Sequence, residues 1–148
     1  ATQAVVDHWI ELGFAGFRAS GFDPWEVVAE VTSPLDGLEV NVRNRPTALT
    51  NLISNAMWAE VEGAQGALLN SGSIRVDDVI APGPITQYDV IRILPFGGPV
   101  VAVEMQGELL LRVLDQGDRN QGGGGYLQRA NLRQDETGSW VVGWCQVR

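Results

Sequence analysis

The sequence predicts an α+β fold in which one domain packs helices against a mixed β-sheet. Stretches with apolar residues at helical spacing alternate along the chain with short apolar runs typical of strands. Some of these runs form hairpin-like pairs, and no internal repeat is present. The 148 residues, 45% hydrophobic and 19% charged, are enough for a single folded domain with a hydrophobic core.

The N-terminal third predicts one helix and two strands. Apolar side chains recur at near-helical spacing over residues 4–18, and the pattern stops at Gly21. The run VVAEV at 27–31 predicts a strand. Alternating apolar residues at 38–42 predict a second short strand after a turn.

The middle of the chain contains the clearest helix, which begins behind Thr47 as a helix cap after Pro46. Its apolar face is predicted to comprise Leu49, Leu52, Ile53, Ala56 and Met57. The unbroken apolar run in GALLN, residues 66–70, predicts a short buried strand.

A second capped helix is predicted near residue 86. Thr86 and Asp89 resemble a capping box, and Pro95 ends the helix that follows them. The remaining predicted elements are a strand at 99–105, a helix at 107–117 with a glycine stop, a glycine-rich loop at 118–125 and a strand at 139–147.

The composition excludes several classes of function. A net charge of −8 repels phosphate backbones, so we expect no nucleic-acid partner. No segment is apolar and long enough to span a membrane, and the first residues lack the basic leader of a signal peptide. One histidine, His8, and one cysteine, Cys145, cannot form a zinc or two-metal site or a disulfide. The glycines at 122–125 lack the lysine of a P-loop.

The first candidate binding cluster is the stretch from Asn70 to Arg75. Small residues at 71–73 let a ligand or another segment approach the backbone, and Arg75 supplies a forked cationic donor for a carboxylate or phosphate. The alternative is a tight turn in which Arg75 pairs with Asp77 or Asp78.

Two further clusters contain an arginine pair and an aromatic ring. Arg43 and Arg45 stand before the capped helix, where the positive end of the helix also favours an anion, although they equally fit ordinary solvated charge. Phe96 precedes two glycines in ILPFGG. An exposed ring on such a loop can stack on a flat ligand, although phenylalanines that cap a core are commoner.

Four motifs occur together in one family: NRPTALTNLISNAM, LLNSGSIR, GPITQYDVIRILPFGG and GGYLQRAN. In order and spacing, over roughly residues 38–130, they resemble the C-terminal domain of the 5′-nucleotidase and 2′,3′-cyclic-nucleotide phosphodiesterase family. The resemblance implies that residues 1–37 lead in from an upstream domain and that residues 38–148 form a substrate-binding domain.

In such enzymes an N-terminal metallophosphoesterase domain holds two divalent metal ions and performs the hydrolysis, while the C-terminal domain grips the nucleotide. The resemblance therefore implies no catalytic or metal-binding residue in this chain. It implies an upstream metallophosphoesterase domain, a nucleotide or nucleoside substrate, and a periplasmic or secreted parent protein.

The resemblance also assigns roles to single residues. Asn70 and Arg75 would meet the ribose or phosphate with Arg45 beside them, or Arg43 in a register shifted by two. Phe96 would form one face of the clamp on the base. The complete set of expected substrate-binding residues is Arg45, Asn70, Gly72, Arg75, Phe96 and Gly124.

The chain departs from the family pattern in its last residues. The family's second aromatic residue comes from a later N-x-F segment, and this sequence ends at WCQVR before any such segment. We therefore expect a domain truncated at its C-terminal end, with weak nucleotide affinity and no hydrolysis by itself. The alternative is a non-catalytic interaction module that kept the fold, lost the ligand and forms a homodimer through an open sheet edge.

Overall fold

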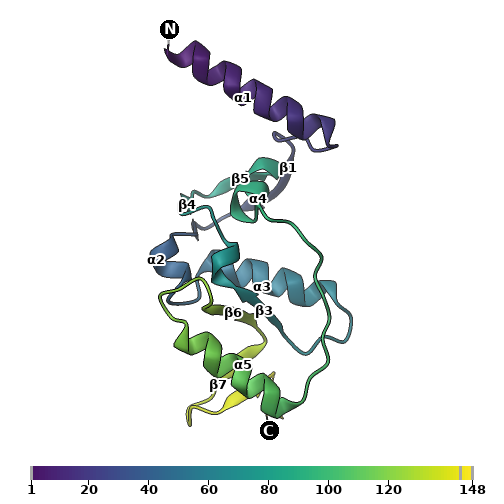
Figure 1. The fold of residues 1–148 in the computed structure, drawn as a ribbon, viewed down its shortest axis with the longest axis vertical. Coiled ribbons are helices and arrows are strands. Elements are labelled where there is room, and N and C mark those ends of the chain that lie inside the picture. The colour runs from purple at the N-terminus through teal and green to yellow at the C-terminus, as the bar shows by residue number, and fades with distance from the viewer. Residues whose placement is uncertain (1, 144, 148) are drawn as a thin grey trace.

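The computed structural model describes residues 2–143 and 145–147 and confirms the α+β class. The first helix, α1 (Thr2–Ala19), projects from the rest of the molecule (Figure 1). It contacts the body through Phe14, whose ring packs edge-on against Trp25 at 5.0 Å and Tyr88 at 5.2 Å between centroids. This aromatic cluster attaches the C-terminal end of α1, while most of its length is exposed.

The strands form four small sheets. The pairs are β1 (Val27–Val31) with β5 (Gly83–Thr86), β2 (Leu35–Asp36) with β4 (Val79–Ile80), β3 (Ala67–Asn70) with β6 (Leu127–Ala130), and β7 (Leu132–Gln134) with β8 (Trp140–Val142), which also pairs with β9 (Cys145–Gln146). All of these pairs are antiparallel, so the prediction of a mixed sheet is wrong. No strand in the described ranges exceeds five residues, and the helix that follows Thr47 packs on the β3–β6 pair.

A short helix replaces the strand predicted at 38–42. Residues Glu39–Val42 form α2, whose backbone N–H groups at Asn41 and Val42 both donate to the carbonyl of Leu38. The side chain of Asp77 accepts a hydrogen bond from the backbone N–H of Glu39 and satisfies one donor of the first turn. Alternation over five residues was therefore too short a pattern to distinguish a strand from one helical turn.

The helix behind Thr47 is confirmed as α3 (Ala48–Glu60), and it begins with a reciprocal cap. The hydroxyl of Thr47 accepts from the N–H of Thr50 at 3.3 Å, and the hydroxyl of Thr50 accepts from the N–H of Thr47 at 2.8 Å. The predicted apolar face is rotated, because the buried residues are Leu49, Thr50 and Ser54, whereas Leu52 is 52% exposed.

One buried polar atom in α3 lacks a partner in the described part of the chain. The hydroxyl of Ser54 is buried, and no hydrogen bond to it is found among those residues. Since an unsatisfied hydroxyl carries a desolvation cost, we expect Ser54→Ala to raise the free energy of unfolding by about 0.5–1 kcal/mol. Urea denaturation of both proteins measures this change, and a loss of stability in the variant would show that the hydroxyl is satisfied in solution.

The helices α4 (Gln87–Ile93) and α5 (Gly107–Arg119) also form where they were predicted. The Thr86–Asp89 capping box is present, with the N–H of Thr86 donating to the Asp89 carboxylate at 3.0 Å. The predicted stop at Gly117 is wrong. This buried glycine lies within α5, where a Cβ would come 2.7 Å from the Leu127 side chain, so it lets the helix pack closely on β6.

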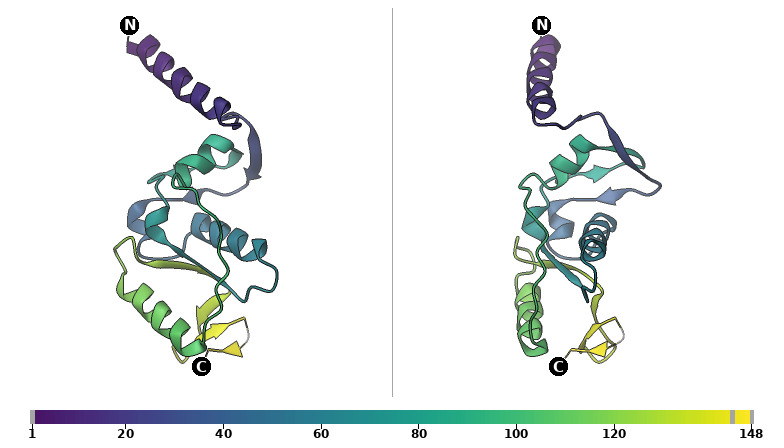
Figure 2. Two further views of the ribbon diagram at one scale, coloured as in Figure 1. Left: turned by 45° about the vertical axis from the view of Figure 1, so that its right-hand side comes forward. Right: turned by 90° about the vertical axis from the view of Figure 1, so that its right-hand side faces the viewer.

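The strand predicted at 99–105 does not form. This segment runs as irregular chain from α4 down to α5 (Figures 1 and 2), with Val101 72% and Val103 68% exposed. Among the described residues no strand pairs with this segment, so its backbone makes no interstrand hydrogen bonds. The single strand predicted at 139–147 is instead the hairpin β8–β9, which turns at Gly143; the side chain of Cys145 lies outside the described residues.

Two hydrophobic clusters stabilise the body. The first comprises Leu35, Leu49, Ile74, Ile85 and Ile93, and the second comprises Leu114, Leu132 and Trp140. In the right-hand view of Figure 2, α5 and the β7–β8–β9 sheet lie on opposite sides of the lower part of the molecule, around the second cluster. The first cluster includes Ile74, the residue immediately before Arg75, and so it anchors the predicted site.

Residues 27–31 pair with 83–86 and therefore belong to the same folded body as the later elements. The domain boundary expected at residue 38 stays a prediction. No helix in the described part of the chain combines the length and the apolar character needed to cross a bilayer.

Candidate functional site

The stretch after β3 folds into the single 3₁₀ turn Ser71–Ser73, whose ends are anchored by backbone hydrogen bonds. The N–H of the fully buried Ser71 donates to the carbonyl of Tyr126 at 2.8 Å. Ile74 is buried, and the N–H of Arg75 donates to the carbonyl of Ile93 at 2.9 Å. The backbone of Arg75 is thus held by the core and by the end of α4, while its side chain is exposed.

Gly72 and Gly124 lie in direct contact. The N–H of Gly72 donates to the carbonyl of Gly124 at 2.8 Å, and a Cβ at position 72 would lie 3.1 Å from the Cα and carbonyl oxygen of Gly124. Asn70 lies beside them, with its side-chain oxygen accepting from the hydroxyl of Ser73 at 2.8 Å. The small residues of this stretch therefore admit the glycine loop of the same chain, and they bring three of the predicted site residues together.

Arg75 and Phe96 form the second part of the site. The guanidinium carbon of Arg75 lies 5.8 Å from the centroid of the Phe96 ring, a cation–π arrangement. Phe96 is 70% exposed and is followed by Gly97 and Gly98, both at positive φ. The alternative of a core-capping phenylalanine is therefore wrong.

The alternative pairing of Arg75 with a neighbouring aspartate is also not found. Asp78 lies 3.7 Å from the guanidinium of Arg92, and Asp77 accepts the hydrogen bond from Glu39. Within residues 2–143 and 145–147, Arg75 makes no ion pair, so its charge stays available to a ligand.

The two arginines before α3 have carboxylate partners. Arg45 lies 3.6 Å from Asp36, and Arg43 lies 2.9 Å from Glu39. Among the described residues, neither guanidinium makes a hydrogen bond to Asn70 or a ring contact with Phe96. The nearest connection is a backbone hydrogen bond, in which the N–H of Gly122 donates to the carbonyl of Arg43 at 2.8 Å. The arginine turn therefore borders the glycine loop without joining the Arg75–Phe96 pair.

Two residues that hold the site were not singled out from the sequence. Gln128 is 1% exposed, and its amide nitrogen donates to the carbonyls of Val42 at 2.5 Å and Arg45 at 3.2 Å. Asn120 donates to the carbonyl of Gly125 at 3.1 Å and closes the glycine loop. The sequence signal for Gln128 is weak: a polar residue on the buried side of a short strand.

Two cavities lie elsewhere on the described part of the chain. One of about 530 Å³ runs along α5, and one of about 480 Å³ lies beside Arg129 and Trp140. Neither of these two cavities is lined by Arg75 or Phe96. The described residues contain no cluster of three or more His, Cys, Asp or Glu side chains able to hold a metal ion.

Comparisons with known proteins agree with the motifs. The sequence matches the family "5′-nucleotidase, C-terminal domain" over residues 27–138. It is 35% identical over 112 residues, 72% of the chain, to the trifunctional nucleotide phosphoesterase protein YfkN of Bacillus subtilis, and 35% identical over 126 residues, 82% of the chain, to a 5′-nucleotidase of Vibrio parahaemolyticus.

A solved structure of a 5′-nucleotidase has the same fold over most of this chain. The crystal structure of the 5′-nucleotidase precursor from Thermus thermophilus superposes with a TM-score of 0.67 at 35% identity and covers 83% of this chain. The chain spans only 25% of that structure, 22% of the Vibrio protein and 8% of YfkN. It belongs to the family of 5′-nucleotidase C-terminal domains.

Proposed function

We propose that this domain binds the nucleotide substrate for a 5′-nucleotidase-type phosphohydrolase. The observation that carries the proposal is the placement of the Arg75 guanidinium 5.8 Å from the centre of the exposed Phe96 ring. The ring offers a surface on which a base can stack, and the guanidinium offers a fixed cation for the phosphate. Asn70, Gly72 and Gly124 support this surface through the turn that precedes Arg75.

The expected affinity is low. Stacking on one aromatic ring contributes about 1–3 kcal/mol per base, and an exposed guanidinium is screened by salt. Arg45 joins the site only if its side chain leaves Asp36, which it contacts at 3.6 Å. The Arg45–Asp36 contact is exposed and therefore of small net strength, so this exchange costs little.

Hydrolysis belongs, in this proposal, to an upstream metallophosphoesterase domain that holds two divalent metal ions. The side chains described here do not fit such a centre, since they offer no cluster of metal ligands. The parent protein is proposed, from the family resemblance, to act in the periplasm or outside the cell. The part played by this chain is to bind and orient the nucleotide.

Nucleotide titrations test the proposal. We expect AMP to perturb the amide NMR signals of residues 70–75 and 96–98, and we expect Phe96→Leu and Arg75→Gln each to weaken binding about tenfold. Arg18→Gln is the matched control, because this exposed arginine lies on α1. Unchanged AMP binding in both site variants would refute the assignment, as would turnover of AMP by this chain with Mn²⁺.

A second candidate function is assembly, favoured by the unpaired segment at 99–106. Its valines are exposed, and its backbone pairs with no strand among the described residues. The backbone is therefore free to form a β-strand pair with the same segment of a second copy. Sedimentation at increasing concentration tests this. A dimer that Val101→Lys abolishes supports assembly through the segment, whereas a monomer at all concentrations contradicts it.

A further inference from the structure

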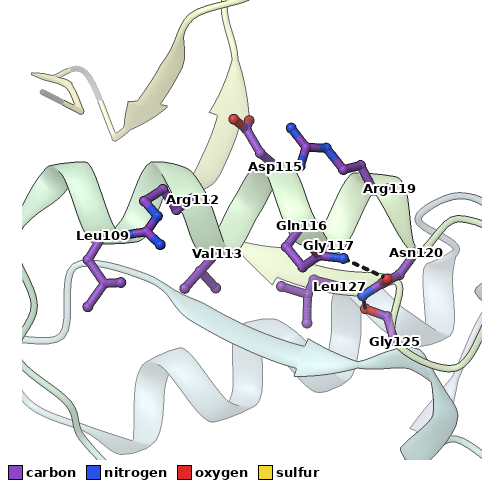
Figure 3. A pocket seen from close by; sticks show the side chains of 10 residues that line it. All are labelled: Leu109, Arg112, Val113, Asp115, Gln116, Gly117, Arg119, Asn120, Gly125 and Leu127. Atoms are coloured by element: carbon purple, nitrogen blue, oxygen red, sulfur yellow. Dashed lines mark hydrogen bonds between the residues drawn. The ribbon is translucent and has the colours of Figure 1, made fainter.

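The cavity along α5 is a second candidate binding site. Figure 3 shows it from close by, with side chains of α5 forming most of its lining. Its volume of about 530 Å³ lies within the range of small-molecule sites. The apolar part of the lining comprises Leu109, Val113 and Leu127, and the polar part comprises Arg112, Asp115, Gln116, Arg119 and Asn120.

Two cations of this cavity lack a partner in the part of the chain that the structure describes. Among the described residues, the side chains of Arg112 and Arg119 make neither an ion pair nor a hydrogen bond. Five other arginines each have a carboxylate within 4 Å: Arg18, Arg43, Arg45, Arg92 and Arg129. In a chain with 18 acidic and 10 basic residues, two arginines on one cavity without such a carboxylate leave a local positive charge.

Arg112 and Arg119 both line the cavity and lie seven residues apart on α5. Seven residues along an α-helix are close to two turns and correspond to about 10 Å, so the two side chains start on the same side of α5. In Figure 3, Leu109, Val113 and Leu127 point to one side of α5, and Asp115 and Arg119 lie on the other. A ligand lying along α5 would thus contact an apolar surface on one side and a guanidinium group on the other.

Hydrogen bonds fix the C-terminal end of the cavity. The amide of Gln116 donates to the side-chain oxygen of Asn120 at 3.0 Å, and Asn120 donates in turn to the carbonyl of Gly125 at 3.1 Å (Figure 3). This chain of hydrogen bonds ties α5 to the glycine loop, so the wall at that end is preformed and binding needs little ordering of these residues.

We propose that the α5 cavity binds a small organic anion, with an apolar body against Leu109, Val113 and Leu127 and a carboxylate or phosphate group held by Arg112 and Arg119. A guanidinium remains charged at all relevant pH values and presents forked donors that match both anions. The cavity includes neither Arg75 nor Phe96, and the proposal goes beyond nucleotide binding at that pair.

Asp115 sets the affinity of this site. Its carboxylate lines the same cavity and accepts a hydrogen bond from the indole nitrogen of Trp140 at 3.4 Å. Its negative charge opposes an incoming anion, and it lies three and four residues from the two arginines on the same helix. Asp115→Asn keeps an acceptor for Trp140 and removes the charge, so this variant should bind the anion more tightly.

Titration of the labelled chain with four probes tests the proposal by amide NMR. Phenyl phosphate and benzoate carry the two anions on an apolar ring, benzyl alcohol carries the ring alone, and inorganic phosphate carries the anion alone. We expect one or both ring-bearing anions to perturb residues 109–120, with a dissociation constant that rises about tenfold in Arg112→Gln and in Arg119→Gln and falls severalfold in Asp115→Asn.

The same spectra supply the controls. Arg18→Gln should leave binding unchanged, and preserved amide spectra show that each variant is folded. The proposal is overturned if the amide signals of α5 do not move, or if the variant that carries both Arg112→Gln and Arg119→Gln binds as well as the original chain. It is also overturned if inorganic phosphate or benzyl alcohol binds as tightly as phenyl phosphate. Signals at residues 70–75 and 96–98 report separately on the nucleotide site, so either proposal can fail alone.

Discussion

Replacing Leu114 with alanine is expected to lower the free energy of unfolding by about 2–5 kcal/mol, the usual cost of removing a buried leucine side chain. Leu114 is 0% exposed and lies in the cluster with Leu132 and Trp140. Through this cluster α5 packs against the three-stranded sheet, with the partly buried Leu110 and Leu111 of the same helix beside Leu114. The alanine variant would leave a cavity between α5 and the sheet, next to the buried side chains of Leu132 and Trp140.

Equilibrium denaturation of the two proteins measures this loss. Leu109→Ala is the matched control, because Leu109 lies on the same helix and is 48% exposed. We expect the control to change the free energy of unfolding by less than about 1 kcal/mol, as surface substitutions usually do. Equal losses in the two variants would mean that α5 does not pack on the sheet through Leu114 as the structure has it.

Local signals in the sequence predicted the helices well. The caps at Thr47 and at Thr86–Asp89 depend on residues three positions apart, and both are present. Burial is less local. The predicted apolar face of α3 is rotated because the side that carries Leu49 packs on Leu35, Ile74, Ile85 and Ile93, which come from distant parts of the sequence.

Strand pairing could not be predicted in the same way. Residues 99–105 have the apolar run and β-branched residues of a strand, yet a strand forms only where a partner supplies hydrogen bonds. None does in the described chain. Pairs such as β3 with β6 join residues about sixty positions apart, and no turn signal connects them.

Two residues of the candidate site could be selected from the sequence although they lie 21 positions apart. Arg75 and Phe96 were singled out by residue type and family spacing, and the structure places the guanidinium against the ring. Their roles in substrate binding stay predictions. The engagement of Arg45 by Asp36 could not be foreseen, because it depends on the chain folding back through the turn before α3.

The site draws its rigidity from the first hydrophobic cluster. Ile74 and Ile93 are both buried in it, and the carbonyl of Ile93 accepts the hydrogen bond from Arg75. Ile74 thus directly precedes Arg75, and Ile93 lies three residues before Phe96. A surface pair on such supports needs less ordering when it binds a ligand, which compensates in part for its exposure.

Gly37→Ala is expected to lower the free energy of unfolding by about 1–3 kcal/mol, the cost of overpacking a filled core position. A Cβ there would come 2.3 Å from Cγ1 of Val76, 2.9 Å from Cδ2 of Leu49 and 3.1 Å from the carbonyl oxygen of Asp78. The Val76 branch is stiff and Leu49 is buried, so the backbone at 76–78 must move instead.

That movement reaches the candidate site, because Val76 directly follows Arg75 and the N–H of Gly37 donates to the carbonyl of Asp78 at 2.9 Å. We therefore expect Gly37→Ala to weaken AMP binding even where the variant remains folded, as titration followed by amide NMR would measure. Gly13→Ala is the control. Apart from the two neighbouring residues and the backbone of its own helix, no described atom would lie within 4 Å of a methyl group at position 13. Alanine also has a higher helix propensity than glycine. A Gly37→Ala variant as stable as the original chain would contradict the close approach of the two segments on which the orientation of Arg75 depends.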